Sequence, residues 1–155
     1  MNPWVLHLLE IAAVVVAGTM TGNEMAVALF FHPRISRLGD AIHARTAQSL
    51  AKALGTWMPV WYVLTFVLSL GLTYVVQPRW TVRWWLVVFA TLLFFLIILY
   101  TLLLPVPINN KIARLEPDSL PLNWIDLRQR WDKLHAIRVF FLIIALILLV
   151  ASVII

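Results

Sequence analysis

Four long apolar stretches, separated by short polar segments, make up most of the chain. They predict helices at residues 4–31, 53–76, 84–104 and 124–152. Each is long enough to cross the ~30 Å hydrocarbon core of a bilayer, which takes about 20 helical residues. The middle two stretches contain no charged residue. The pattern predicts an all-α integral membrane protein, a four-helix bundle that forms one membrane domain over residues 1–155.

Prolines and polar residues mark the expected helix ends. Pro33 is expected to end the first helix near residue 32, because proline lacks an amide hydrogen and its ring clashes with the preceding turn. The basic segment 33–52 is expected to form a separate short helix at the membrane interface. Pro105 is expected to end the third helix. Asn2 and Asn123 are expected to cap the first and fourth helices, since a short polar side chain can accept amide hydrogens of the first turn.

A stripe of aromatic and cationic residues distinguishes the fourth predicted helix. Steps of three and four residues return to the same helix face. Such steps connect Trp124, Arg128, Trp131, His135 and Arg138. A helix over 124–152 would be ~43 Å long, so its first turns are expected to project on the cytoplasmic side. Arg138 directly precedes the uncharged run 139–155, and a cation at that depth needs a partner inside the protein.

Composition narrows the function classes. The chain is 63% hydrophobic and 12% charged, and it has no cysteine, which excludes disulfides, iron–sulfur clusters and thiolate metal sites. Acidic and basic residues alternate in the long third loop, which argues against a nucleic-acid partner. Lys and Arg are concentrated in the first and third loops, so these loops are expected to be cytoplasmic, with both termini outside. A bacterial-type inner membrane is the expected location.

Depth along the helices groups the buried polar residues. Glu24 lies about 20 residues into the first helix and His135 lies 20 residues before the C-terminus, so both are expected ~30 Å from the outer face. Glu24 is therefore the expected counter-ion of Arg138, or a proton acceptor beside His135. These residues predict a polar pocket open to the cytoplasmic side. Its expected walls are Asn23, Glu24 and His32, then Asn109 and Asn110, then the stripe on the fourth helix.

Several residues have a simpler alternative interpretation. The Glu24–Arg138 pair could only join two helices, and Trp124 and Trp131 could be interfacial anchors. His43 is expected in an exposed loop. His7 and Glu10, one turn apart near the outer face, are expected to be solvated. Asn109 and Asn110 could only cap backbone that is broken after the prolines.

A metal site is a further alternative. His32, His135 and Glu24, with His43 as a further histidine, offer nitrogen and oxygen ligands of the kind that copper, iron or zinc accepts. No pair has a close spacing such as His-x3-His, so the sequence gives only a weak indication of metal. Haem would need an axial histidine, for which His135 or His32 could serve.

Two motifs stand out: the step Pro107-Ile108-Asn109-Asn110 and the stripe Trp131-x3-His135-x2-Arg138. They resemble those of the anthrone-oxygenase-like family of small four-helix membrane proteins, most of which carry a domain-of-unknown-function label. The resemblance implies an oxygenase that converts aromatic polyketide anthrones to quinones, without an obvious organic cofactor. It also implies that Asn109, Trp131, His135 and Arg138 are pocket residues.

The function hypothesis is therefore an oxygenase-type oxidoreductase for a hydrophobic aromatic or quinone-like molecule. His135 would be the base, and Arg138 and Asn109 would stabilise an oxyanion. Glu24 would orient His135 or balance the charge of Arg138, and Trp131 would stack on the substrate. Further expected substrate-binding residues are Asn110, Arg128 and Asn23. The alternatives are a copper- or iron-dependent membrane enzyme and a non-catalytic accessory or lipid-binding module. Small residues at Ala12, Ala13, Ala17 and Gly18 could pack helices within one chain or in a homo-oligomer.

Overall fold

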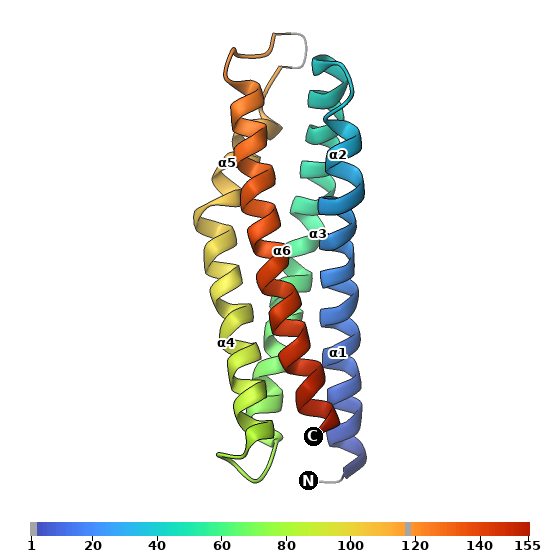
Figure 1. Ribbon diagram of the computed structural model, residues 1–155, viewed down its shortest axis with the longest axis vertical. Helices are drawn as coiled ribbons and strands as arrows, with labels where there is room; N and C mark the ends of the chain where they lie inside the picture. Colours follow the sequence, from blue (N-terminus) through green and yellow to red (C-terminus); the bar gives the residue numbers. More distant parts are fainter. Residues whose placement is uncertain (1–2, 117–118) are drawn as a thin grey trace.

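A computed structural model describes residues 3–116 and 119–155, which leaves the predicted cap Asn2 outside the described part. Figure 1 shows long helices that run side by side, with both termini at the end of the bundle that holds the α3–α4 turn. The described elements are all helical: α1 (Pro3–Ala26), η1 (Val27–Phe31), α2 (His32–Ile35), α3 (Asp40–Val75), α4 (Val82–Leu103), α5 (Pro105–Ala113) and α6 (Trp124–Ile154). Four helical runs are long and apolar enough to cross a membrane. The protein is thus an integral membrane helical bundle.

The first helical run continues through Pro33, so the predicted end near residue 32 is wrong. The run extends from Pro3 to Ile35, and the five residues before His32 form a π-helical segment. The wider π turn accommodates a residue that lacks an amide hydrogen and whose ring would otherwise meet the carbonyl four residues earlier. The extra turn places His32 inside the bundle.

The basic segment 33–52 does not form a separate interfacial helix. Most of it belongs to α3, which has 36 residues and continues through Pro59. Ala44 and Ala47 are buried among Ile108, Trp124 and other apolar side chains from α5 and α6. These small side chains let the helices approach closely. This part of α3 thus packs in a second apolar cluster, separate from the main core that contains Phe94 and Leu142.

The predicted break after the third helix is present. α4 ends at Leu103, and the chain resumes directly as α5, with Pro105 in its first turn, where a missing amide hydrogen removes no helical bond. α6 has 31 residues. Its buried residues Leu142, Ala145 and Leu149 continue the helix face that carries the predicted stripe of aromatic and cationic residues.

Asn123 does not cap α6 with its side chain, contrary to prediction. Its backbone lies at φ −93° and ψ 13°, not in the extended conformation that lets an N-cap side chain reach the first turn. Its carbonyl instead accepts the amide hydrogen of Leu127 at 3.1 Å.

Candidate functional site

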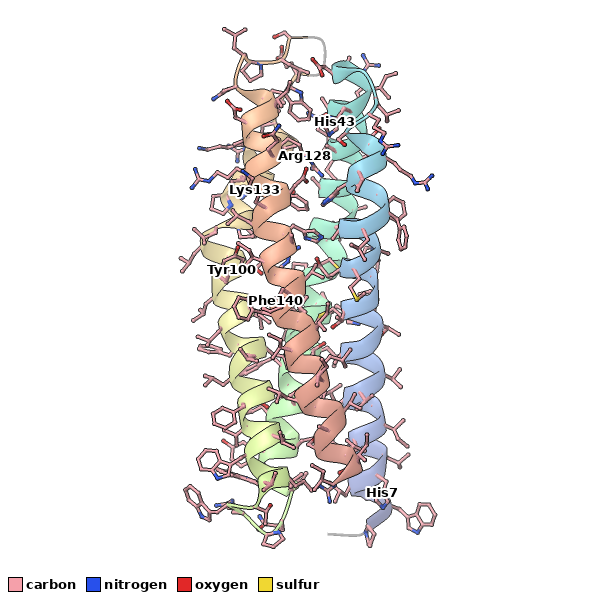
Figure 2. The ribbon with its side chains drawn as sticks, viewed as in Figure 1. His7, His43, Tyr100, Arg128, Lys133 and Phe140 are labelled. Carbon is pink, nitrogen blue, oxygen red and sulfur yellow. The ribbon has the colours of Figure 1, made fainter. Side chains whose placement is uncertain are left out.

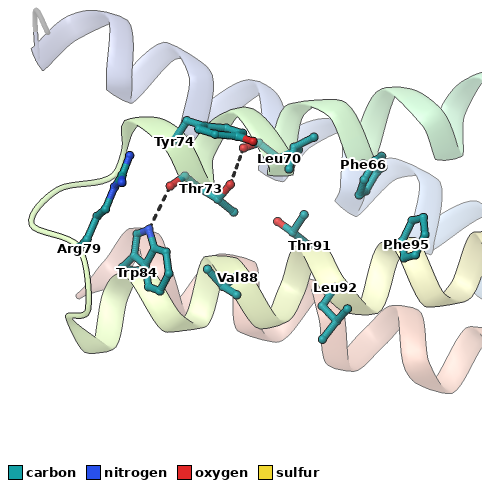
Figure 3. A pocket seen from close by; sticks show the side chains of 10 residues that line it. All are labelled: Phe66, Leu70, Thr73, Tyr74, Arg79, Trp84, Val88, Thr91, Leu92 and Phe95. Atoms are coloured by element: carbon teal, nitrogen blue, oxygen red, sulfur yellow. Dashed lines mark hydrogen bonds between the residues drawn. The ribbon is translucent and has the colours of Figure 1, made fainter.

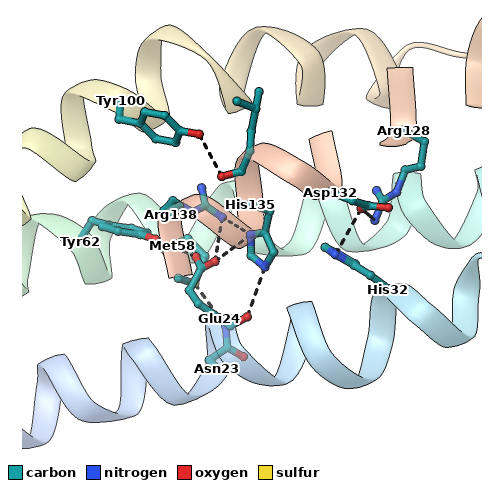
Figure 4. Close-up of polar contacts among 11 residues, drawn as sticks. Asn23, Glu24, His32, Met58, Tyr62, Tyr100, Arg128, Asp132, His135 and Arg138 are labelled. Carbon is teal, nitrogen blue, oxygen red and sulfur yellow. Dashed lines mark hydrogen bonds and ion pairs between the residues drawn. The ribbon is translucent and has the colours of Figure 1, made fainter. Parts of the chain in front are cut away.

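Three helices bring four polar side chains together in the interior of the bundle (Figure 4). Arg138 Nη2 of α6 donates to Glu24 Oε2 of α1 at 2.7 Å, and Tyr62 of α3 donates its hydroxyl hydrogen to Glu24 Oε1 at 3.0 Å. His135 lies beside them, with Nδ1 3.2 Å from Glu24 Oε2. The predicted pairing of Glu24 with Arg138 is therefore present, and these four residues are called the inner network below.

The hydrogen bonds of His135 assign its tautomer. Nε2 lies 3.2 Å from the backbone carbonyl oxygen of Glu24, which can only accept, so this nitrogen carries the hydrogen. Nδ1 lies 2.7 Å from Arg138 Nη2, which can only donate, so this nitrogen presents its lone pair. The imidazole is thus neutral, and its basic nitrogen faces the guanidinium.

Water has little access to the inner network. The side chain of Glu24 is 4% exposed, that of Arg138 is 9% exposed and that of His135 is 1% exposed. An ion pair in such surroundings interacts more strongly than one in water, and each charge would be unfavourable without the other. Removal of either Arg138 or Glu24 would therefore leave the other charge buried without a counter-ion.

Trp131 already has ring partners within the protein. It is stacked on His135 with ring centroids 4.9 Å apart and an interplanar angle of 11°, and His32 meets it edge-on at 4.8 Å. The guanidinium carbon of Arg128 lies 4.7 Å from its ring centroid. Trp131 is buried and is not an interfacial anchor. A substrate ring could stack on it only by displacing one of these neighbours.

A second polar group lies one to two turns from the inner network on α6. Arg128 Nη2 pairs with Asp132 Oδ1 at 3.0 Å, and His32 Nδ1 lies 3.3 Å from the same oxygen. Arg128, predicted to bind substrate, is thus paired with a carboxylate. The sequence interpretation did not single out Asp132, although its position four residues after Arg128 is the usual spacing of a helical ion pair.

His43 and Trp124 lie elsewhere than predicted. Both are buried, and their rings meet edge-on at 4.9 Å. His43 is not in an exposed loop because α3 starts at Asp40, and Trp124 is not an interfacial anchor because the lengthened α3 covers it.

None of the three predicted asparagines forms a hydrogen bond with the inner network in the described part of the chain. Asn23 Nδ2 donates to the sulfur of Met58 at 3.5 Å. Asn109 is half-buried in α5, close to Gly55 of α3, and Asn110 is exposed. Neither Asn109 nor Asn110 makes a capping bond at the start of α5.

Two tyrosines were not anticipated. Tyr62 holds one oxygen of Glu24, and the Tyr100 hydroxyl of α4 donates to the backbone carbonyl of Leu134 at 3.1 Å. A tyrosine in an otherwise apolar helix is a usable signal, because a buried phenol hydroxyl usually finds a partner.

The proposed metal ligands do not fit a metal ion as they are arranged. His32, Glu24 and His135 are neighbours, with the two imidazole centroids 4.9 Å apart. Their polar atoms, however, face Asp132, Arg138 and the Glu24 carbonyl. Among the described residues, no group of three His, Cys, Asp or Glu is placed to hold a metal.

A second Glu–Arg pair lies toward the end of the bundle that carries the termini. Glu10 is buried and pairs with Arg83 of α4, and its other oxygen lies 3.1 Å from His7 Nδ1. The prediction that Glu10 is solvated is wrong, because its side chain is 4% exposed and Arg83 reaches it from α4. Figure 2 shows His7 at the end of the bundle opposite to His43 and Arg128. Glu10, Arg83 and His7 are called the outer cluster below.

A cavity of about 460 Å³ lies between α3 and α4, away from the inner network (Figure 3). Its walls are mainly apolar, and no residue of the inner network lines it.

A family model described as anthrone oxygenase matches residues 41–148, which contain Tyr62, His135 and Arg138 but not Glu24. No curated protein and no solved structure matches the chain.

Proposed function

Since the chain belongs to the anthrone oxygenase family, we propose that it is a membrane-embedded oxygenase for a hydrophobic aromatic or quinone-like small molecule. In the proposed reaction, a methylene group beside an aromatic ketone loses a proton to the protein. The electron-rich carbanion then reacts with dioxygen. One oxygen atom becomes the new carbonyl, and the other leaves as water with the two methylene hydrogens, so the reaction needs no further oxidant.

One observation carries the proposal: Arg138 Nη2 lies 2.7 Å from both Glu24 Oε2 and His135 Nδ1. If a substrate oxygen accepts the hydrogens of Arg138, the lone pair of His135 Nδ1 loses its donor and becomes available as a base. The same guanidinium then stabilises the oxyanion that deprotonation creates. Binding of the substrate and activation of the base are thereby coupled.

Glu24 completes this arrangement. Its Oε2 lies 3.2 Å from His135 Nδ1, so it can stabilise the imidazolium that forms when His135 takes a proton. Tyr62 holds the carboxylate from its other oxygen. We assign Asn109 of α5, which lies close to Gly55 of α3, to assist Arg138 at the substrate oxygen.

Buried donors without acceptors also support an oxygen-bearing ligand. In the described part of the chain, Arg128 Nε, Trp131 Nε1 and Arg138 Nε are buried and lack a hydrogen-bond partner. Each such group costs about 1–3 kcal/mol when left unpaired. All three belong to one face of α6, and carbonyl or phenolate oxygens of a bound anthrone would satisfy them.

The proposed orientation places both termini outside and the loops around residues 36–39 and 114–123 in the cytoplasm. It is supported by the concentration of Lys and Arg near these loops. The inner network then lies in the cytoplasmic half of a bacterial-type inner membrane, and a hydrophobic substrate would enter from within the bilayer.

Oxygen uptake tests the proposal. Purified protein in detergent micelles is given an anthrone or a hydroquinone, and the rate is compared between His135→Ala and His7→Ala. Loss of a general base lowers the rate about 10²–10⁴-fold, so we expect this for His135→Ala only. If uptake is absent in the unmodified protein, or survives His135→Ala, the inner network is a structural ion pair. Elemental analysis of the same sample separates a metal-dependent enzyme from one in which His135 and Arg138 act without a metal.

A further inference from the structure

The cavity between α3 and α4 has an apolar end and a polar end. Phe66 and Phe95 close the inner end, with ring centroids 5.7 Å apart. Between these rings and the α3–α4 turn, the walls are lined by Leu70, Val88 and Leu92. At the other end, next to the turn between the helices, Tyr74 and Arg79 join the lining. Figure 3 shows this order along the two helices, with Arg79 on the turn and the two phenylalanines farthest from it.

The cavity is about as deep as one leaflet of a bilayer. From Trp84 to Phe95 along α4, eleven residues rise ~16 Å, which is about half of the ~30 Å hydrocarbon core. The cavity's volume of about 460 Å³ is within the range of small-molecule sites. Leu92 is 48% exposed, so the cavity is a groove that opens sideways toward lipid and not a closed chamber.

The charge at the polar end is not neutralised by the protein. The turn region carries two cations, and Arg83 is paired with Glu10. Arg79 is exposed and, within the described part of the chain, forms no salt bridge. The neighbouring rings of Trp80, Trp84 and Trp85 contact one another, and tryptophan clusters of this kind favour the headgroup level of a membrane. Arg79 is therefore a cation at headgroup level, without a salt bridge in the described part of the chain, at the polar end of an apolar groove.

We propose that this groove binds one acyl chain of an anionic phospholipid, with the lipid phosphate on Arg79. The chain would lie along Leu70, Val88 and Leu92 and end at the two phenylalanines. The charge complementarity selects an anionic headgroup over a zwitterionic one, since one Arg near the surface contributes about 1 kcal/mol toward an anionic lipid, or about fivefold. This site is separate from the inner network and does not depend on the proposed oxygenase activity.

Site-specific fluorescence quenching tests the proposal, because the chain has no native cysteine. A single Leu92→Cys carries a small fluorophore in the groove, and Leu96→Cys, at a residue that is 47% exposed on the same helix, is the matched control outside it. The labelled full-length proteins are placed in vesicles that contain phosphatidylglycerol or phosphatidylcholine with brominated acyl chains. We expect brominated phosphatidylglycerol to quench the label at 92 about fivefold more effectively than phosphatidylcholine, and the two lipids to quench equally at 96.

Arg79→Gln in the Leu92→Cys background then identifies the headgroup contact. We expect it to abolish the preference at 92 and to leave quenching at 96 unchanged. Val88→Phe, which fills the groove without touching Arg79, should lower quenching at 92 by both lipids. Equal quenching by the two lipids at 92 in the unmodified background would overturn the proposal, as would a preference that survives Arg79→Gln. Displacement of the brominated lipid by an anthrone at equimolar concentration would instead make the groove a substrate site.

Discussion

Two glutamates of the first helix each pair with an arginine of another helix, in very different surroundings. Glu24 pairs with Arg138 in the inner network, and Glu10 pairs with Arg83 in the outer cluster. They are fourteen residues apart, nearly four turns, so both lie on about the same face of α1. The side chain of each glutamate is 4% exposed, yet Arg138 is 9% exposed and Arg83 is 26% exposed.

The histidines differ even more. His135 in the inner network is 1% exposed and uses both ring nitrogens, whereas His7 in the outer cluster is 61% exposed. The same pair of charges is thus partly open to water on its arginine side at the end of the bundle, and insulated on both sides inside it. Among the described residues of these two groups, only the insulated pair holds a neutral imidazole against a cation, and the proposed reaction requires the substrate to release that imidazole.

The largest expected effect is the loss of Glu24. Glu24→Ala leaves Arg138 buried without its carboxylate, which typically destabilises a fold by about 3–5 kcal/mol. The free energy of unfolding in mixed detergent micelles measures this. A loss below about 1 kcal/mol would mean that water reaches Arg138.

Removing both charges sharpens the comparison. Glu24→Leu combined with Arg138→Leu replaces the buried pair by apolar side chains, so we expect stability close to that of the unmodified protein. Oxygen uptake should be absent in this double variant. Recovery of stability together with full activity would show that the pair is a structural link only.

Tyr62→Phe should have the next largest effect. It removes one hydrogen bond to a buried carboxylate, and bonds to charged groups contribute about 1.5–3 kcal/mol. The same unfolding measurement checks it, with Tyr74→Phe as the control, because Tyr74 is exposed. Equal effects of the two substitutions would place the Tyr62 hydroxyl outside the network.

The smallest effect is expected in the outer cluster. Glu10→Ala should lower the free energy of unfolding by about 1 kcal/mol, because Arg83 is 26% exposed and can turn to water once the carboxylate is removed. Raising the salt concentration should weaken the contribution of Glu10 further and leave that of Glu24 unchanged. A salt-independent loss of several kcal/mol at Glu10 would remove the distinction between the two pairs.

Depth along straight helices was enough to predict that Glu24 meets Arg138, because the rise per residue is fixed. Tyr62 lies within the predicted helix 53–76 and was missed because tyrosine was not among the side chains compared by depth. The misplacement of His43 in a loop has a different cause, since α3 starts at Asp40 and not at residue 53. The burial of Glu10 depends on which helix lies beside it, and depth alone does not determine neighbours across the bundle.

The pattern of apolar residues predicted the membrane helices and the break at Pro105, which depend on local chemistry. Pro33 and Asn123 behaved otherwise than predicted, because packing of the long helices outweighed the local preference of each residue. The pairing of Arg128 with Asp132 follows from their i,i+4 spacing on α6 and was readable from the sequence. The contact of Trp131 with His32 was not, because it depends on the continuation of the first helix past Pro33.

The measurement that tests the central distinction most directly is oxygen uptake by Arg138→Lys and Arg83→Lys, assayed side by side with an anthrone. Lysine keeps each positive charge but cannot reproduce the guanidinium's contacts to a carboxylate and a base at once. We predict that Arg138→Lys lowers the rate about 10²-fold or more, as expected for loss of an oxyanion donor, and that Arg83→Lys stays within about twofold of the unmodified protein. Equal rates in the two variants would contradict the assignment of catalysis to the inner network.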